Sequence, residues 1–384
     1  MTFCFFSAQY LPTVGGVERY THNLGKCLVK KGHRVVVVTS ALPGLPGQET
    51  ADGIEIFRLP VFPVMGGRFP VLKCNAAYRR AKRMLNALPM DFIVVQTRFY
   101  TNSLLGARMA KRRGIPAIVI EHGTAHLMRG GLAGVLGNVY EHWMMRKIRR
   151  CCDCFYGVST ACCKWLAHFG VQTDKVLYNA VDPAALAATA AQCGDAFLAP
   201  YLAQSPVRSA PVIAFAGRFI PEKGVLPLLE AFRTVQGQYP SARLLLAGDG
   251  PQLAAAREVL PEGAQLLGML PYAQNLALLA RADIFCLPTF SEGFSTSVLE
   301  AAALRAAILT TPTGGSPELV ENESYGLLFP DMRAESIAAA LCRALADPAW
   351  CQTAQQNAYD KLLRCFTWER VSDALIEIAK AAVR

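Results

Sequence analysis

The chain has 384 residues, of which 52% are hydrophobic and 18% charged; this excludes a disordered protein and predicts two domains, because one ordinary core does not accommodate that length. The net charge of +10 is uneven: residues 1–180 contain 24 Lys and Arg against 9 Asp and Glu, and the remaining residues contain 15 against 20. A first half of net charge +15 beside a second half of −5 favours membrane phospholipid or an acidic acceptor as partner, since no zinc-finger, RNA-recognition or basic-zipper signature supports nucleic acid.

The 13 cysteines are odd in number and often lie in apolar runs, as Cys4 and Cys286 do. This usage suits reduced thiols in a cytoplasmic protein. The cluster from Cys151 to Cys163 lacks the C-x-x-C pairs of a structural zinc site, so we predict no metal there. The start, residues 1–6, has no basic n-region, and no apolar run reaches the ~18 residues that cross a bilayer. We therefore expect a cytoplasmic protein that can lie on the inner face of a membrane.

The first residues predict a βαβ unit. Residues 3–6 and 34–39 are apolar strands, and a helix with Leu24 and Leu28 on one face lies between them. The loop Gly15-Gly16-Val17-Glu18 precedes this helix. It is not G-x-G-x-x-G, so a dinucleotide site is poorly supported. Two glycines at a helix start permit a phosphate or sugar to approach, and a plain tight turn is the alternative.

A basic segment follows. Residues 58–71 contain three prolines and two glycines, which predicts irregular structure. Residues 73–88 have helical spacing, and Lys73, Arg79, Arg80, Lys82 and Arg83 cover much of that helix. Such a helix can lie on an anionic membrane, and an ordinary solvated face is the alternative.

Three more strands, at residues 91–96, 117–120 and 154–158, continue the first domain. Glu121-His122-Gly123 comes directly after the second of these strands. Because ligands of open α/β sheets bind at the carboxyl ends of strands, we favour a functional His122 over a satisfied core histidine.

The domain boundary lies in a segment rich in Ala, Gln and Pro. We predict a first domain over residues 1–182, a linker over 183–211, a second domain over 212–365 and a C-terminal helix over 366–384 that packs back on the first domain.

The second domain opens with a strand at residues 212–216. Gly217-Arg218 and Lys223-Gly224 lie in the loop between this strand and a helix over residues 225–235. Two cations at a strand end can clamp a pyrophosphate, and a surface ion pair with Glu222 is the alternative.

A later loop carries two acids. Glu292 and Glu300 follow the apolar strand 283–288 and precede residues 301–307, which we predict to be helical. The amides of residues 293–295 at the start of that helix can bind phosphate. A solvated loop acid and a helix-surface Glu are an equally good interpretation of the spacing.

Together these motifs resemble those of glycosyltransferase family 4, retaining enzymes with the GT-B fold. The resemblance implies an α/β fold class, with two Rossmann-like doubly wound domains facing across a cleft. It spans nearly the whole chain and is carried by Gly15-Gly16-Val17-Glu18, Gly217-Arg218 through Lys223-Gly224, Glu292 to Glu300, and Gly314-Gly315 with Pro317-Glu318.

The resemblance also implies roles for single residues. Arg218 and Lys223 would hold the diphosphate of the donor and Glu300 its ribose hydroxyls. Glu292 would face the transferred sugar, and His122 corresponds to a histidine that the family places near the sugar and acceptor. The remaining donor-binding positions are the amides of Gly293, Phe294 and Ser295, and the glycine loop with Gly15 and Gly16.

The sequence departs from the family pattern in two places. Family members usually have Gly and then Pro soon after the second Glu, where this chain has Arg305 and Ala307. If Arg305 ends the helix at positive φ, that conformation costs ~1 kcal/mol. Ala180 replaces a frequent Gly.

We therefore predict transfer of a sugar from a nucleoside diphosphate to the hydroxyl of a glycan or lipid-linked acceptor, with retention of configuration. No D-x-D sequence occurs, so we expect no cofactor and no divalent metal: Arg218 and Lys223 would stabilise the leaving diphosphate. Glu292 and His122 would position and polarise the sugar. Two alternatives are a nucleotide-sugar epimerase or hydrolase on the same fold, and a membrane- or nucleic-acid-binding protein without catalysis.

Overall fold

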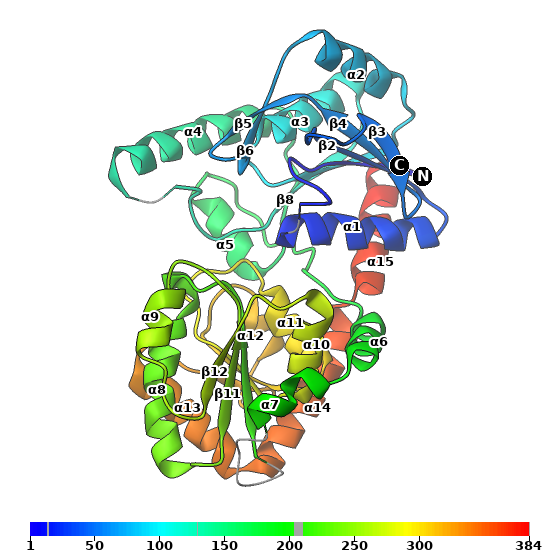
Figure 1. The fold of residues 1–384 in the computed structure, drawn as a ribbon. Coiled ribbons are helices and arrows are strands. Elements are labelled where there is room, and N and C mark those ends of the chain that lie inside the picture. Colours follow the sequence, from blue (N-terminus) through cyan, green and yellow to red (C-terminus); the bar gives the residue numbers. More distant parts are fainter. Residues whose placement is uncertain (14, 129, 203–209, 384) are drawn as a thin grey trace. The chain divides into compact units, whose positions relative to one another are not determined.

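The computed structural model describes residues 1–13, 15–128, 130–202 and 210–383. The chain forms two compact units, which are best considered separately (Figure 1). The first contains Met1–Asn179 and the segment from Trp368 onward, and the second contains Ala180–Thr367. Of the predicted linker and terminal helix, residues 203–209 and Arg384 lie outside the described residues.

The first unit is built on a seven-stranded sheet in the order β3-β4-β2-β1-β7-β8-β9. Every pairing is parallel except that of β3 with β4. The central strands are uninterrupted apolar runs, as expected for strands that helices cover on both faces; Phe3 and Val35, which pair in register, are both fully buried. The strands are β1 (Thr2–Phe6), β2 (Arg34–Ser40), β3 (Gln48–Ala51), β4 (Ile54–Leu59), β7 (Phe92–Gln96), β8 (Ala117–Glu121) and β9 (Phe155–Gly157). The helices are α1 (Gly16–Lys30), α2 (Ala76–Ala87), α3 (Thr101–Arg113), α4 (Gly131–Arg149), α5 (Thr160–Ala167) and α15 (Trp368–Val383).

The last of these helices, α15, packs against α1 although the two are separated by most of the sequence. The Tyr20 and Trp368 rings meet edge to face at 5.3 Å. Lys31 pairs with Asp373 and donates to the carbonyl of Glu369 at 3.1 Å. The second unit is therefore inserted into the chain of the first.

The prediction that residues 58–71 are irregular is wrong. Residues up to Leu59 complete β4, and β5 (Val61–Val64) and β6 (Phe69–Leu72) form a two-stranded antiparallel hairpin in which Pro63 lies opposite Pro70. Both strands of an isolated hairpin are edge strands, so a proline can point its missing N–H outward without breaking a ladder.

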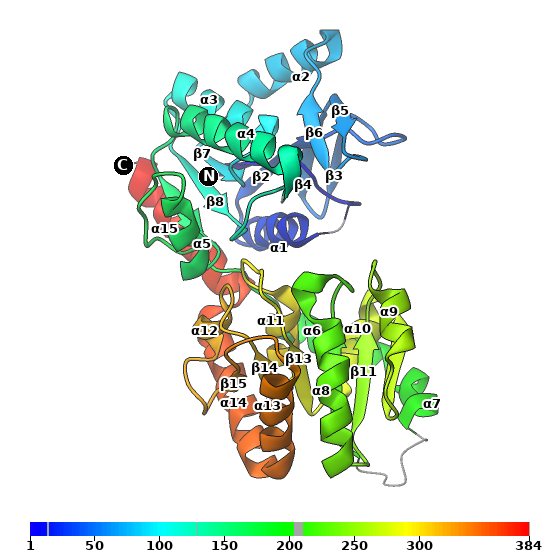
Figure 2. The ribbon, with the colours of Figure 1, turned by 90° about the vertical axis from the view of Figure 1, so that its left-hand side faces the viewer.

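The second unit contains a six-stranded parallel sheet in the order β12-β11-β10-β13-β14-β15. Helices cover both faces, with α8 against α13 on one and α6, α10, α11 and α14 on the other (Figures 1 and 2). The strands are β10 (Val212–Ala216), β11 (Arg243–Ala247), β12 (Ala264–Gly268), β13 (Ile284–Leu287), β14 (Ala307–Thr310) and β15 (Leu327–Leu328). The helices are α6 (Pro183–Cys193), α7 (Ala199–Leu202), α8 (Val225–Gln238), α9 (Leu253–Glu258), α10 (Tyr272–Arg281), α11 (Thr296–Ala303), α12 (Ser316–Leu319), α13 (Ala334–Ala346) and α14 (Pro348–Cys365), with 3-10 turns η1 (Ala196–Leu198) and η2 (Pro221–Lys223).

Two boundary predictions in this unit are corrected. The first part of the predicted linker, 183–211, is the helix α6, which Asp182 caps and which packs against α10. The helix predicted over residues 301–307 ends earlier, because α11 stops at Ala303 and Ala307 already belongs to β14. Arg305 lies between them at φ 63°, the conformation for which the sequence analysis expects a cost of ~1 kcal/mol.

Candidate functional site

Two loops of the second unit leave its sheet at the point where the strand order reverses. From the adjacent strands β10 and β13 the chain proceeds outward in opposite directions, to β11 and β12 on one side and to β14 and β15 on the other. Ligands of open α/β sheets bind beyond the carboxyl ends of strands at such a reversal. Arg218 and Lys223 follow β10, and Glu292 follows β13.

The two loops are in direct contact. The Thr289 hydroxyl donates to the carbonyl of Glu222 at 2.8 Å, and the Phe290 amide donates to the same oxygen at 3.1 Å. Gly224 has φ 65°, and a Cβ at this position would lie 2.2 Å from the carbonyl oxygen of Pro288. Only glycine allows the loops to approach this closely.

Lys223 and Glu292 form an ion pair between these loops. Their side chains are 16% and 14% exposed. Lys223 is therefore a partly buried cation, and the carboxylate of this ion pair comes from the other loop. Arg218 is exposed at the same edge of the sheet.

The segment after Glu292 leads into α11. Phe294 is buried, with its ring edge to face against Phe366 at 5.2 Å, so this residue can offer a ligand only its backbone. The Ser295 side chain makes no capping hydrogen bond to the first turn of α11 and lies 3.0 Å from the Ser297 hydroxyl. Gly315 approaches from the loop after β14, and a Cβ there would lie 2.3 Å from the Phe294 ring.

Glu300 is buried inside α11, at 4% exposure. Its Oε1 accepts a hydrogen bond from the Tyr272 hydroxyl at 2.8 Å. The alternative of a solvated helix-surface Glu is thus wrong for Glu300. The sequence prediction missed Tyr272; the only signal was its place at a helix start soon after a strand.

The first unit has a cavity of about 350 Å³ at the corresponding place, where β1 and β7 are neighbours and the strand order reverses. Its lining includes Glu18, Gln96, Arg98 and His122. The first two residues of the glycine loop do not line it; Gly15 caps α1 with extended backbone. A Cβ at Gly15 would lie 2.3 Å from Oε2 of Glu18, so the glycine makes room for this carboxyl group, whose pKa is raised by burial.

His122 is held in one orientation. Its Nε2 lies 2.6 Å from Oε1 of Gln96 and therefore carries the proton of the neutral ring. The Tyr20 ring meets the imidazole edge to face at 4.8 Å. Burial lowers the pKa of His122 to about 3, so the imidazole is neutral near pH 7.

A buried group of charges supports the loop that carries His122. Arg98 is fully buried and donates at 2.5 Å both to Glu121, at the end of β8, and to Glu141, in α4. Oε1 of Glu121 accepts the amides of His122 and Gly123, at 3.1 and 3.0 Å. Sequence reasoning missed this group, because nothing local indicates that Arg98 and Glu141 approach Glu121.

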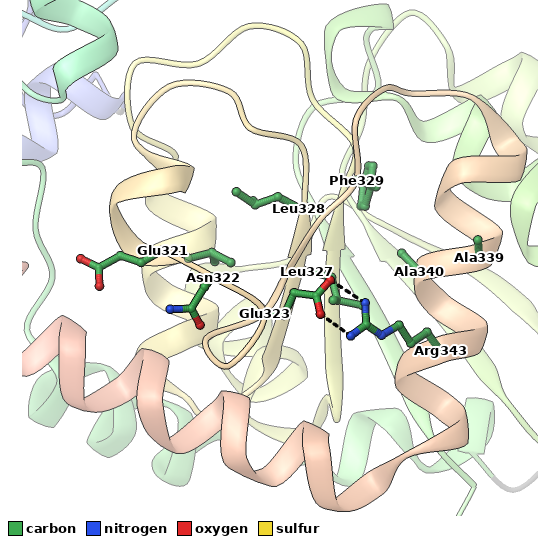
Figure 3. Close-up of a pocket in the computed structure, with 11 residues that line it drawn as sticks. Glu321, Asn322, Glu323, Leu327, Leu328, Phe329, Ala339, Ala340 and Arg343 are labelled. Carbon is green, nitrogen blue, oxygen red and sulfur yellow. Dashed lines mark hydrogen bonds and ion pairs between the residues drawn. The ribbon is translucent and has the colours of Figure 1, made fainter.

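A cavity of the second unit, of about 300 Å³, lies between the segment around β15 and α13 (Figure 3). Glu323 and Arg343 bind each other there through two hydrogen bonds of 2.7 and 2.5 Å, so their charges cancel. This cavity lies at the edge of the sheet and not at its strand reversal, and it is not our candidate site.

Within the described ranges, no three His, Cys, Asp or Glu side chains are placed to hold a metal ion together. All thirteen cysteines are free thiols. None of the helices formed by described residues combines the length and hydrophobicity needed to cross a bilayer.

Comparison with known proteins covers both units. Residues 14–185 match the family model described as Glycosyltransferase Family 4, and residues 203–361 match the one described as Glycosyl transferases group 1. Glycogen synthase of Mycobacterium tuberculosis is 26% identical to this chain, over 100% of the chain and 95% of the relative. A phosphatidylinositol N-acetylglucosaminyltransferase of Homo sapiens is 23% identical, over 96% of the chain and 74% of the relative.

Among solved structures, Anabaena Alr3699/HepE in complex with UDP-glucose aligns with a TM-score of 0.72 at 18% identity, covering 99% of this chain and 100% of that one. At this identity the likeness shows the fold alone, and the fold is GT-B.

Proposed function

Since the chain belongs to glycosyltransferase family 4 and is a glycosyltransferase with the GT-B fold, we propose that it transfers a sugar from a nucleoside diphosphate to an acceptor hydroxyl with retention of configuration and without a divalent metal. The observation that carries this proposal is the contact of Lys223 with Glu292 at the strand reversal of the second unit.

The cations of this site would act on the leaving group. A departing diphosphate gains negative charge, and fixed positive groups in a partly buried site stabilise it as it forms. An ammonium has three N–H donors, so Lys223 can bind a phosphate oxygen while it keeps its contact with Glu292. Arg218 would add a second, bidentate donor group. Backbone amides of Gly293, Phe294 and Ser295 would complete the anion site.

Glu300 would bind the ribose. It already accepts a hydrogen bond from Tyr272 through Oε1, and an ionised carboxylate has room for about four such bonds. The two ribose hydroxyls would donate to the same carboxylate.

Glu292 and His122 would orient the transferred sugar. Because His122 is neutral, it would act as a hydrogen-bonding group and not as a strong general acid. We also propose that Gly15 and Gly16 bind near the diphosphate; their place at the start of α1 supports this.

Two observations support a proposal for the acceptor: the net positive charge of the first half of the chain and the names of its relatives. The excess of cations in the first half favours an anionic or lipid-linked acceptor. The human relative is by its name a phosphatidylinositol N-acetylglucosaminyltransferase. We propose assembly of a surface polysaccharide or lipopolysaccharide by a cytoplasmic enzyme that lies on the inner face of a membrane.

The test is a thermal-shift panel of uridine, guanosine and adenosine diphosphates and their sugars, followed by product analysis. A ligand at about 100 times its Kd stabilises the folded protein by ~2.7 kcal/mol, enough to move a thermal transition. We expect one nucleotide to do so, and its sugar to appear on the acceptor in the donor's anomeric configuration. Free sugar formed equally fast without acceptor would instead identify a hydrolase, and an epimerised donor an epimerase. No nucleotide shift together with tight DNA or vesicle binding would favour a binding protein.

A further inference from the structure

The outer face of α4 is apolar over most of its length. Leu132, Val135, Leu136, Val139 and Trp143 are between 51% and 76% exposed. Leu132, Leu136, Val139 and Trp143 are spaced by four, three and four residues, and Val135 lies three residues after Leu132, so these side chains lie on one side of the helix. They account for a third of the large hydrophobic side chains that the described residues expose.

The opposite face of the same helix is anchored in the first unit. Met144, Met145 and Ile148 are part of its core, and Glu141 pairs with Arg98. The helix therefore presents the apolar face while it is held by buried contacts along its other side.

The charge of the exposed face changes at Trp143. Arg146, Lys147 and Arg150 follow it at three, four and seven residues, and Nζ of Lys147 lies 5.5 Å from the centre of the Trp143 ring. The only acid in α4, a helix whose residues are all described, is Glu141, and it is fully buried. An apolar stripe, a tryptophan at its boundary and cations beyond it are the pattern of a helix that lies in a membrane interface.

The hairpin β5–β6 adjoins this helix. The Phe69 ring packs edge to face against Tyr140 of α4 at 5.6 Å. The hairpin exposes Phe62, Val64 and Met65 by 44% to 52%. The apolar surface thus includes a second element of the same unit.

We propose that the outer face of α4 binds an anionic lipid bilayer, with its apolar side chains at the acyl boundary and its cations among the headgroups. This inference deepens the proposed membrane association, on which it rests, and assigns it to α4 and not to the basic helix α2. The exposed face of α2 carries Arg79, Arg80 and Arg83 but only one large apolar side chain, Met84. The cations of α2 can attract anionic lipid, but this helix exposes few apolar side chains that could enter the bilayer.

The test uses the full chain and vesicles of phosphatidylcholine, alone or mixed equally with phosphatidylglycerol. We expect binding to the mixed vesicles, and quenching of Trp143 fluorescence when the lipids carry brominated acyl chains. Trp143→Phe should remove most of that quenching. Leu136→Glu with Val139→Glu should weaken vesicle binding more than tenfold, because two apolar side chains no longer enter the bilayer. Arg146→Gln with Lys147→Gln should weaken it roughly thirtyfold, at about fivefold for each cation.

Two controls match these changes. Leu363→Glu places an acid on an exposed apolar position of the second unit and should leave vesicle binding within twofold of the wild type. Arg79→Gln with Arg80→Gln removes the same charge from α2 and should weaken binding less than the pair in α4.

The inference is overturned by an absence of quenching, by α4 variants that bind like the wild type, or by a concentration-dependent dimer that Leu136→Glu abolishes, since a second copy would then cover this face. The nucleotide-induced thermal shift, measured on the same variants, separates the two proposals. If the nucleotide-induced shift persists while vesicle binding is absent, the result supports donor binding and contradicts the α4 inference.

Discussion

At the scale of single residues, the sequence shows which side chains follow the carboxyl ends of strands, but it does not show which of these side chains contact one another. Lys223 and Glu292 were both predicted as site residues, and their ion pair follows from the order of β10 and β13 in the sheet, which no local pattern encodes. Tyr272 and Arg98 were missed for the same reason, because their partners are distant in sequence.

Lys223→Met should lower kcat/KM by about 10²–10³ by removing one donor to the leaving group. It should also destabilise the second unit by ~1–3 kcal/mol, because Glu292 loses its ion pair with Lys223 in a partly buried place. The double variant Lys223→Met with Glu292→Gln should recover stability but not activity. Arg218→Ala, at an exposed position, should lose activity without losing stability. Denaturant unfolding measures the stability and steady-state kinetics the activity. Near-normal turnover of both Lys223→Met and Arg218→Ala would refute the proposal that these two cations bind the diphosphate.

Tyr272→Phe deletes only the hydroxyl that donates to Glu300. We expect KM for the donor to rise about fivefold, the effect of one hydrogen bond of ~1 kcal/mol, with kcat nearly unchanged. A 2′-deoxy donor should lose affinity with the wild type and less with the variant. Equal losses in both proteins would show that Glu300 does not contact the ribose.

The lowered pKa of His122 predicts how the free energy of unfolding changes with pH. Its pKa is about 3 in the folded protein, below its ordinary value of 6.5. The unfolded chain therefore binds the proton first as pH falls, and the folded state loses stability from about pH 6.5 downward, by at most ~1.4 kcal/mol per pH unit for this one group. His122→Gln should flatten that dependence. Urea unfolding of both proteins between pH 7 and about pH 4.5 checks it, and parallel curves would contradict it.

At the scale of elements, strands that are continuous apolar runs were predictable, and the proline-containing strands of the hairpin were not. β1, β2, β10 and β13 are buried on both faces and read as continuous apolar runs. The hairpin β5–β6 was missed because prolines normally break strands, and only its isolation from a larger sheet makes them tolerable.

The end of α11 offers a matched pair of substitutions. Arg305 adopts φ 63° while its guanidinium lies 3.9 Å from the centre of the Tyr359 ring and donates to Gln356 at 2.7 Å. Arg305→Ala and Arg305→Gly both delete these contacts, but only glycine relieves the backbone. We expect the alanine variant to be the less stable of the two by ~1 kcal/mol in denaturant unfolding. Equal stabilities would mean that the turn rearranges.

At the scale of the whole molecule, the fold class was predicted from the family resemblance that the motifs carry, and the comparisons confirm the GT-B fold and the family. The extent of each unit was harder to predict. The composition of residues 183–193 suggested a linker, although contacts with α10 make this segment part of the second unit.

The two units should respond separately to core truncations. Leu375 in α15 and Leu362 in α14 are both fully buried, one in each unit. Each Leu→Ala change should cost ~2–5 kcal/mol, and calorimetry should show the loss in a different transition for each. The nucleotide shift should survive Leu375→Ala and weaken with Leu362→Ala. A single transition lowered equally by both would indicate that the units unfold together.

The return of α15 to α1 also sets an order for biosynthesis. The second unit ends at Thr367, so all of its residues are synthesised before the first residue of α15. The first unit is translated first, yet α1 keeps its docking surface for α15 bare until the residues from Trp368 onward emerge. A nascent chain stalled before Trp368 should therefore recruit chaperones through the first unit, although that unit is the older part of the polypeptide.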